Sequence, residues 1–175
     1  MEKDLSLWLF AAFVIATAVG TLLHFLWDWT RLALLKPISA VNESTWEHMK
    51  ILFFPMLIVA VIQSRFFIEE YPSFWWIKLI GILIGVLSIP VLFYTINGVF
   101  GKTPDWLNVL FFFISAGVAY FCEWILFRNH FSLEYTWIAV VIIGIIAAIF
   151  VAFTYYPPKL PIFEDPRIKA GKIEV

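Results

Sequence analysis

Five long apolar stretches follow one another along the chain, separated by short polar segments. They cover residues 5–27, 46–67, 75–96, 106–127 and 137–156. A helix needs about 20 predominantly apolar residues to cross the hydrocarbon core of a bilayer. Each stretch reaches that length, and tryptophans and tyrosines gather near the ends, where their rings favour the headgroup region. The pattern predicts an all-α polytopic membrane protein whose five transmembrane helices form a single bundle within residues 1–156.

The remaining segment, residues 157–175, has a different pattern. Its prolines prevent a helix from continuing, yet Leu160, Ile162 and Phe163 are apolar. We expect an ordered strip that lies on the membrane surface or crosses back over the helix ends, because aromatic and aliphatic residues are scarce in disordered segments. A disordered proline-rich tail is the alternative.

The composition agrees with a membrane protein and excludes several other classes. Of the 175 residues, 62% are hydrophobic and 14% are charged, whereas an average soluble domain is about 45–50% apolar and about 25% charged. A chain of this size cannot bury so much apolar surface in one water-soluble core, which excludes a soluble enzyme and a disordered chain. The formal net charge of -1 gives no basic excess for nucleic acid. The single cysteine, Cys122, excludes an internal disulfide, and its apolar neighbours predict a buried side chain.

Lysine and arginine counts predict the orientation of the bundle. With five spans, the N-terminus and the second and fourth loops share one side, which holds four of these residues, and the other side holds seven. The side richer in positive charge usually faces the cytoplasm. We therefore expect the N-terminus outside and the first loop, the third loop and the C-terminal tail in the cytoplasm.

The candidate chemistry lies between residues 23 and 50, where the first span ends and the second begins. Ionisable groups at membrane depth are expensive and usually face a protein interior or a water-filled cavity. Six such groups occur here: His24, Asp28, Glu43, Glu47, His48 and Lys50.

Helical spacing and the short loop predict that these groups meet. His24 and Asp28 are four residues apart and share one helical face. The first two helices form an antiparallel pair, so this face can meet Glu43, Glu47 and His48. Two imidazoles and several carboxylates suit a divalent metal such as zinc. We predict His24, Asp28 and His48 as metal ligands and Glu43 and Glu47 as catalytic residues; a proton relay and a purely structural cluster are the alternatives.

Local structure offers a second explanation for one of these residues. The run from Ser44 to Glu47 fits the capping-box pattern, in which the serine caps the second helix and the glutamate reaches back. Glu47 and His48 point about 100° apart on a helix, so at most one of them faces a given partner squarely. This spacing weakens any metal site that needs both residues.

One acidic residue lies apart from the cluster. Glu123 occurs late in the fourth span and therefore belongs to the opposite face of the membrane. We expect it to pair with Arg128 or to contact water from that side.

Three motifs relate this chain to a known family. They are V-N-E-S-x-W-E-H-x-K over residues 41–50, His24-x-x-x-Asp28 before it and Y-P-P-x-L-P-x-F-x-D-P at the end. The chain resembles an uncharacterised family of small polytopic bacterial membrane proteins, a domain of unknown function. The resemblance implies a bacterial or archaeal cytoplasmic membrane and no particular activity. More loosely, the chain resembles ceramidase-type membrane hydrolases, which build a zinc site from His, Asp and Ser; it departs from them in having five spans rather than seven and no His-x-x-x-His.

Three functions fit these observations. The first is a metal-dependent hydrolase acting on a lipid or another membrane-delivered substrate. The second is a binding or transport protein for a small solute or protons, and the third is a structural membrane subunit. The later spans carry few polar residues besides Lys50, Asn108 and Glu123, so a continuous polar path is hard to draw. We therefore favour the hydrolase.

Overall fold

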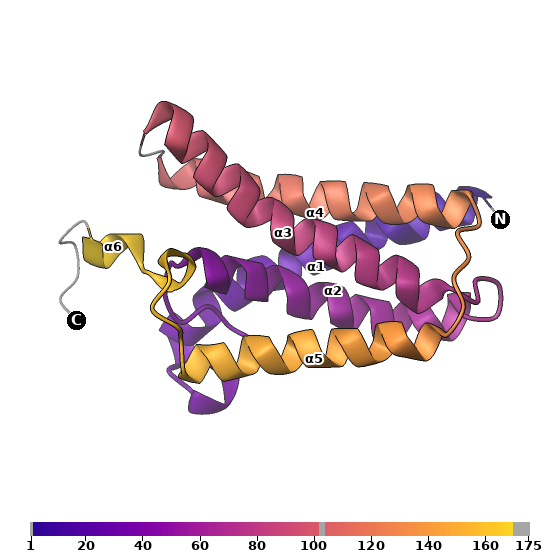
Figure 1. The fold of residues 1–175 in the computed structure, drawn as a ribbon, viewed down its shortest axis with the longest axis horizontal. Helices are drawn as coiled ribbons and strands as arrows, with labels where there is room; N and C mark the ends of the chain where they lie inside the picture. Colours follow the sequence, from indigo (N-terminus) through magenta and orange to yellow (C-terminus); the bar gives the residue numbers. More distant parts are fainter. Residues whose placement is uncertain (1, 102–103, 170–175) are drawn as a thin grey trace.

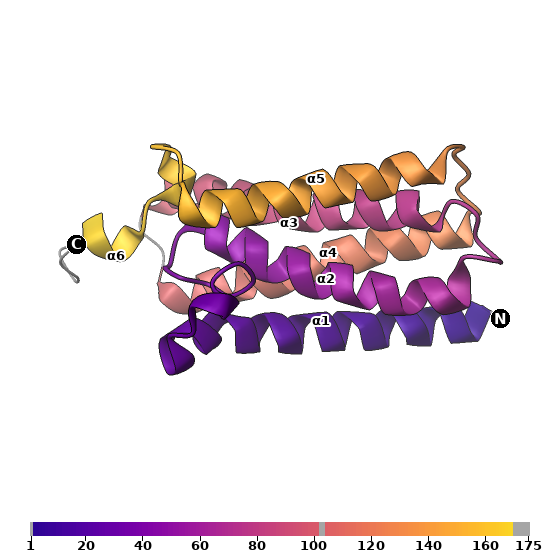
Figure 2. The same cartoon turned by 90° about the horizontal axis from the view of Figure 1, so that it is seen from below.

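The computed structural model describes residues 2–101 and 104–169 as an elongated bundle of helices (Figures 1 and 2). Five of the helices are long and apolar enough to cross a membrane, which confirms the all-α fold with five spans. Two short 3-10 helices and a short sixth helix complete the described chain, and residues 170–175 of the predicted tail lie outside it. The bounds are α1 Glu2–Thr30, η1 Ala33–Leu35, α2 Thr45–Phe67, α3 Phe74–Phe100, α4 Asp105–Arg128, α5 Thr136–Tyr155, η2 Pro161–Phe163 and α6 Pro166–Lys169.

The helices run alternately up and down the bundle, and α2 lies at its centre. Helix α1 contacts α2 and α4, while α3 contacts α2, α4 and α5. Of the five spans, α2 is the most enclosed by protein and α5 the least. Large apolar side chains cover the outer surface, which suits contact with lipid. Several polar side chains of α2, namely Thr45, Glu47, Lys50 and Gln63, are therefore buried inside the protein.

The two ends of the bundle carry different segments. The beginning of α1 lies at one end, together with the α2–α3 and α4–α5 connections (Figure 1). The α1–α2 connection, the end of α3, the start of α4 and the described residues after α5 lie at the other end, which we call the tail end. All candidate residues between 24 and 50 belong to the tail end or to the adjoining helix turns.

The segment after α5 folds back across the start of α2. The ring of Phe163 lies 4.7 Å from that of Trp46, measured between centroids. On its other side, Trp46 packs 4.6 Å from Phe150 of α5. The described part of the tail thus crosses back over the helix ends at Phe163, which is one of the arrangements expected for the strip. Trp46 thus joins α2, α5 and the tail.

A second buried polar site lies toward the opposite end of the bundle and corrects two predictions. The Lys78 ammonium is 2.6 Å from the Glu123 carboxylate, and the side chains are 2% and 1% exposed. The prediction that Glu123 pairs with Arg128 or reaches water is therefore wrong, because Glu123 is buried and pairs with Lys78 of the neighbouring helix α3. Cys122, expected to be buried, is partly exposed on the neighbouring face of α4.

Candidate metal centre

His24 reaches the site from inside the first span. It lies six residues before the end of α1, which corresponds to about 9 Å along the helix axis. Its ring packs edge-on against Phe25, with centroids 4.8 Å apart. The side chain is 22% exposed, so the imidazole is partly enclosed but remains accessible.

The start of α2 is fixed by a local network of caps. Ser44 has an extended backbone, and its hydroxyl accepts a hydrogen bond from the Glu47 N–H. The Glu47 carboxylate accepts from the Val41 N–H at 2.9 Å, whereas the Ser44 N–H donates to the Asn42 side chain. This is a capping box in which the glutamate reaches three residues farther back than the usual pattern. The network sets the direction in which His48, one turn along, leaves the helix.

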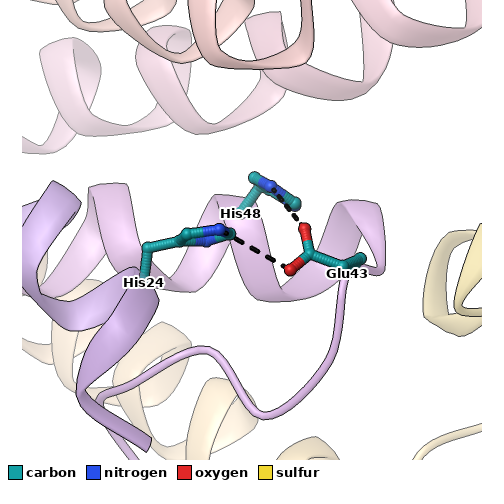
Figure 3. A group of neighbouring side chains, drawn as sticks. All are labelled: His24, Glu43 and His48. Carbon is teal, nitrogen blue, oxygen red and sulfur yellow. Dashed lines mark ion pairs between the residues drawn. The ribbon is translucent and has the colours of Figure 1, made fainter. Parts of the chain in front are cut away.

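Two histidines and one glutamate converge at this position (Figure 3). His24 Nε2 lies 3.6 Å from Glu43 Oε1, and His48 Nε2 lies 3.7 Å from Glu43 Oε2. One ligand atom from each of the three residues lies within 4.8 Å of the others. The residues come from α1, from the segment before α2 and from α2, so the antiparallel helix pair builds the group.

The three residues form ion-pair contacts, and their spacing is also compatible with a shared cation. Hydrogen bonds between nitrogen and oxygen are about 2.7–3.2 Å long, so the 3.6 and 3.7 Å separations are too long for them. Tetrahedral zinc with bonds of about 2.0–2.1 Å places its ligands about 3.4 Å apart. Small side-chain rotations would bring the three donors to that spacing.

The tautomer of His48 is set for ligation. Its Nδ1 lies 2.9 Å from the Ser44 carbonyl oxygen. A carbonyl can only accept, so Nδ1 carries a proton and donates it, which leaves Nε2 with a free lone pair in the neutral ring. Histidine ligands in metal sites are usually oriented by such a bond from the other ring nitrogen.

The tail holds Glu43 from the outer side. The Asp165 carboxylate accepts a hydrogen bond from the Glu43 N–H at 3.2 Å, and Arg167 binds the same carboxylate through two guanidinium nitrogens. A third nitrogen, Arg167 Nη1, lies 3.7 Å from Glu43 Oε1. The tail therefore fixes the backbone of Glu43 and places a positive charge beside its side chain.

Charge and burial act in opposite directions on Asp165. Burial raises the pKa of Asp165. The hydrogen bonds from Arg167 and from the Glu43 N–H together lower it by more, so the net pKa lies below the usual 3.8. The hydrogen bond with Asp165 in turn raises the pKa of Arg167. The pair is thus fully ionised at neutral pH.

The structure separates the remaining predicted residues from the group. Asp28 forms a surface ion pair with Arg31 at 2.8 Å, and its side chain is 55% exposed. Glu47 is buried and pairs with Lys50 at 2.6 Å. The predicted cluster therefore divides into an open group of two histidines with Glu43, a buried Glu47–Lys50 pair and an exposed Asp28.

Two contributors were missed by sequence reasoning. Arg167 reaches the group from the tail, and the Thr154 hydroxyl accepts a hydrogen bond from Lys50 at 2.9 Å. Both lie more than a hundred residues from their partners, so no local spacing reveals them. The prolines and apolar residues of the tail were the available signal, since they indicated that it returns to the helix ends.

Cavities border His48 on two sides. The larger has a volume of about 110 Å³ and lies between α1, α2 and α4. The smaller, of about 20 Å³, adjoins Glu43, His48 and Asn108. Within the described residues, the Asn108 side-chain oxygen is buried and has no hydrogen-bond partner. His48 therefore lines two cavities, one of which also borders His24 and the other Glu43.

Comparison with known proteins identifies the family. Residues 1–173 match the family model described as "Family of unknown function (DUF6512)", and the chain belongs to this family. No curated protein and no solved structure matches the chain. Membership confirms the expected relation to an uncharacterised family.

Proposed function

We propose that this member of the DUF6512 family binds a divalent metal ion, zinc being the best match, and acts as a metal-dependent hydrolase on a lipid or another membrane-delivered substrate. One observation carries the proposal: two imidazole nitrogens face the two oxygens of one carboxylate at 3.6 and 3.7 Å. Two histidines and a glutamate form a ligand set that catalytic zinc sites use, with the fourth position left open.

Each residue has a role in this proposal. His24, His48 and Glu43 hold the ion, and Glu43 is the acidic residue nearest the reacting centre. Asp165 acts as a positioning residue for Glu43. Glu47, which we also predicted as catalytic, supports the site from the buried side through its cap and its ion pair. Zinc, when bound, acts as a Lewis acid and lowers the pKa of a bound water to about 7.

The location supports a substrate that arrives through the membrane. His24 lies within a span, and apolar side chains surround the larger cavity beside it. From the lysine and arginine bias we further propose that the site faces the cytoplasmic side of a bacterial or archaeal membrane, with the N-terminus outside. Reporter fusions at Val175 test this orientation: activity of a reporter that functions only in the periplasm would reverse it.

The reaction is tested with purified full-length protein in liposomes made from a bacterial lipid extract. We expect zinc-loaded protein to convert at least one lipid into products whose summed mass exceeds that of the substrate by one water, as measured by mass spectrometry. His48→Ala should abolish this conversion, and His130→Ala, which changes the histidine at the other end of the bundle, should retain it. Metal binding without any hydrolysed lipid would contradict the hydrolase and leave a metal-binding membrane protein.

A further inference from the structure

We propose that the cavity between α1, α2 and α4 receives the apolar chain of a membrane lipid, so that the polar end of the lipid lies against His24 and His48. This proposal rests on the proposed function only in taking the histidine group as the place where the polar end binds. It names the substrate class of that site as a chain-bearing lipid rather than a water-soluble solute.

The cavity begins at the two histidines and continues toward the middle of the bundle. Its volume is about 110 Å³, which is comparable with the ~150 Å³ of a cavity that binds benzene. On α1 and α2, the lining residues Gly20, Thr21 and Ile51 lie on the membrane-interior side of the two histidines. The full lining consists of Gly20, Thr21, His24 and Phe25 of α1, His48 and Ile51 of α2, and Val109, Phe112 and Phe113 of α4.

The lining away from the histidines offers little to a polar solute. Thr21 is its one hydroxyl-bearing residue among those described, and that hydroxyl already donates to the Thr17 carbonyl oxygen at 2.8 Å. A hydrated solute would lose hydrogen bonds to water there without replacing them. An alkyl chain loses none.

The cavity borders the lipid-facing surface of the bundle. Three of its lining residues, Phe25, Val109 and Phe113, are 44%, 57% and 38% exposed. They lie in α1 and α4, both of which are long and apolar enough to span the membrane. A lipid chain can therefore enter between α1 and α4 from the bilayer without crossing water.

Close helix contact at one glycine gives the cavity a firm inner wall. A Cβ at Gly20 would lie 2.6 Å from the Phe112 ring and 2.7 Å from the Ile51 carbonyl oxygen. The ring of Phe112 and the start of α2 are thus packed directly against α1. Ile51 and Phe112 are 2% and 5% exposed, so a lipid bound to the outer surface does not reach them.

The energetics assign the polar end to the histidines. A chain that moves from the bilayer into an apolar cavity gains no hydrophobic free energy, because lipid is as apolar as the protein. It gains packing contacts that an empty cavity lacks. The affinity and orientation of the lipid must then come mainly from its polar end, and His24 and His48 are the ionisable side chains among the residues that line the cavity.

The inner wall provides a direct test. Full-length protein in liposomes is incubated with palmitic acid that carries a diazirine in the middle of its chain, irradiated, digested and mapped by mass spectrometry. We expect covalent label on Ile51 and Phe112, in addition to label on outward-facing residues. Label confined to outward-facing residues would overturn the proposal.

Two variants on the same helix separate the cavity from the general lipid contact. Val109→Trp fills the cavity and should remove the label from Ile51 and Phe112. Leu110→Trp is the matched control, since Leu110 is 42% exposed but does not line the cavity, and it should retain that label. Equal labelling of the inner wall in both variants would overturn the proposal.

The same samples distinguish this inference from the metal site. Val109→Trp should still bind zinc, because the three proposed ligands His24, Glu43 and His48 are unchanged, while losing the inner-wall label. In zinc-free protein, His48→Ala should remove a contact that fixes the position of the lipid chain along the cavity. The label should then spread along the cavity rather than staying at Ile51 and Phe112. Label on Ile51 and Phe112 in a protein that binds no zinc would support the lipid site and contradict the metal-dependent hydrolase. Zinc binding without label on these two residues would contradict the lipid site and leave the metal site standing.

Discussion

Two acidic residues on either side of the start of α2, Glu43 before it and Glu47 in its first turn, have opposite environments. The Glu47 carboxylate is 2.6 Å from the Lys50 ammonium, with side chains 3% and 0% exposed. Lys50 also donates to the Lys36 carbonyl oxygen and to Thr154, so all three of its N–H bonds are used. Glu43, four residues before Glu47, faces His24 and His48 at distances too long for hydrogen bonds. We call Glu47 and Lys50 the closed pair, because the ammonium has all of its hydrogen bonds. We call His24, Glu43 and His48 the open group, because these residues make no hydrogen bonds to one another.

This contrast separates structural from chemical roles among residues that look alike in sequence. A closed buried pair has no capacity left for a ligand, and removing one partner leaves an uncompensated charge. An open group of lone pairs and carboxylate oxygens is unsatisfied by its own members and can accept an ion. Proximity of ionisable residues in the chain therefore does not define the site; completeness of pairing does.

Breaking the closed pair should have the largest effect on stability. Lys50→Ala leaves the Glu47 carboxylate buried and unpaired, so we expect the free energy of unfolding to fall by about 3–5 kcal/mol. Replacing both residues, as Glu47→Gln with Lys50→Met, should recover most of that loss. Denaturant titration in detergent micelles measures the difference. Equal stability of Lys50→Ala and the unchanged protein would show that the pair is not structural.

Breaking the open group should affect metal binding instead. His48→Ala removes a proposed ligand, and we expect zinc affinity to fall by more than the roughly 10–100-fold that loss of an outer-shell partner costs. The free energy of unfolding of the metal-free protein should change by less than about 1 kcal/mol, because the side chain is partly exposed. Isothermal titration with zinc compares the variant with His130→Ala, which should bind as the unchanged protein does.

The tail makes the open group sensitive to acid. The pKa of Asp165 is lowered in the folded state, so its ionised form stabilises the attached tail above the usual value of 3.8, and this contribution is lost as the pH falls through the lower folded pKa. A nitroxide at exposed Leu160, introduced as cysteine with Cys122→Ser, should become mobile below that pH. Asp165→Asn should show the mobile spectrum at neutral pH, and an immobile spectrum there would contradict the anchoring role.

The exposed pair should matter least. Asp28 and Arg31 form a surface ion pair, and such pairs contribute about 0–1 kcal/mol. We expect Asp28→Ala to leave both the free energy of unfolding and zinc affinity nearly unchanged. A loss of zinc binding in this variant would restore Asp28 to the ligand set that the sequence predicted.

The fold and the end of the bundle that carries the site could be predicted from sequence. Apolar length fixes the five helices, and the short loop after the first one forces His24 and His48 to the same level. The residues that complete the group could not be predicted. Selection of Glu43 over Asp28 depends on the path of the connecting segment and on Asp165, which lies 122 residues along the chain. Spacing within a helix carries no information about such contacts.

The same limit explains the second buried pair. Lys78 and Glu123 lie 45 residues apart on adjacent helices, and the sequence offered Glu123 a nearer partner in Arg128. The α3–α4 interface brings them together instead. Gly81 contributes, because a Cβ there would clash with the Glu123 side chain.

The measurement that tests the account most directly is the zinc content of the purified full-length protein, determined by elemental analysis after dialysis against metal-free buffer. The account predicts close to one ion per chain in the unchanged protein and in His130→Ala. It predicts a loss of that ion in both His24→Ala and His48→Ala, with all variants remaining folded. A folded protein that takes up no divalent metal, or that keeps it when His24 and His48 are both replaced, would contradict the account.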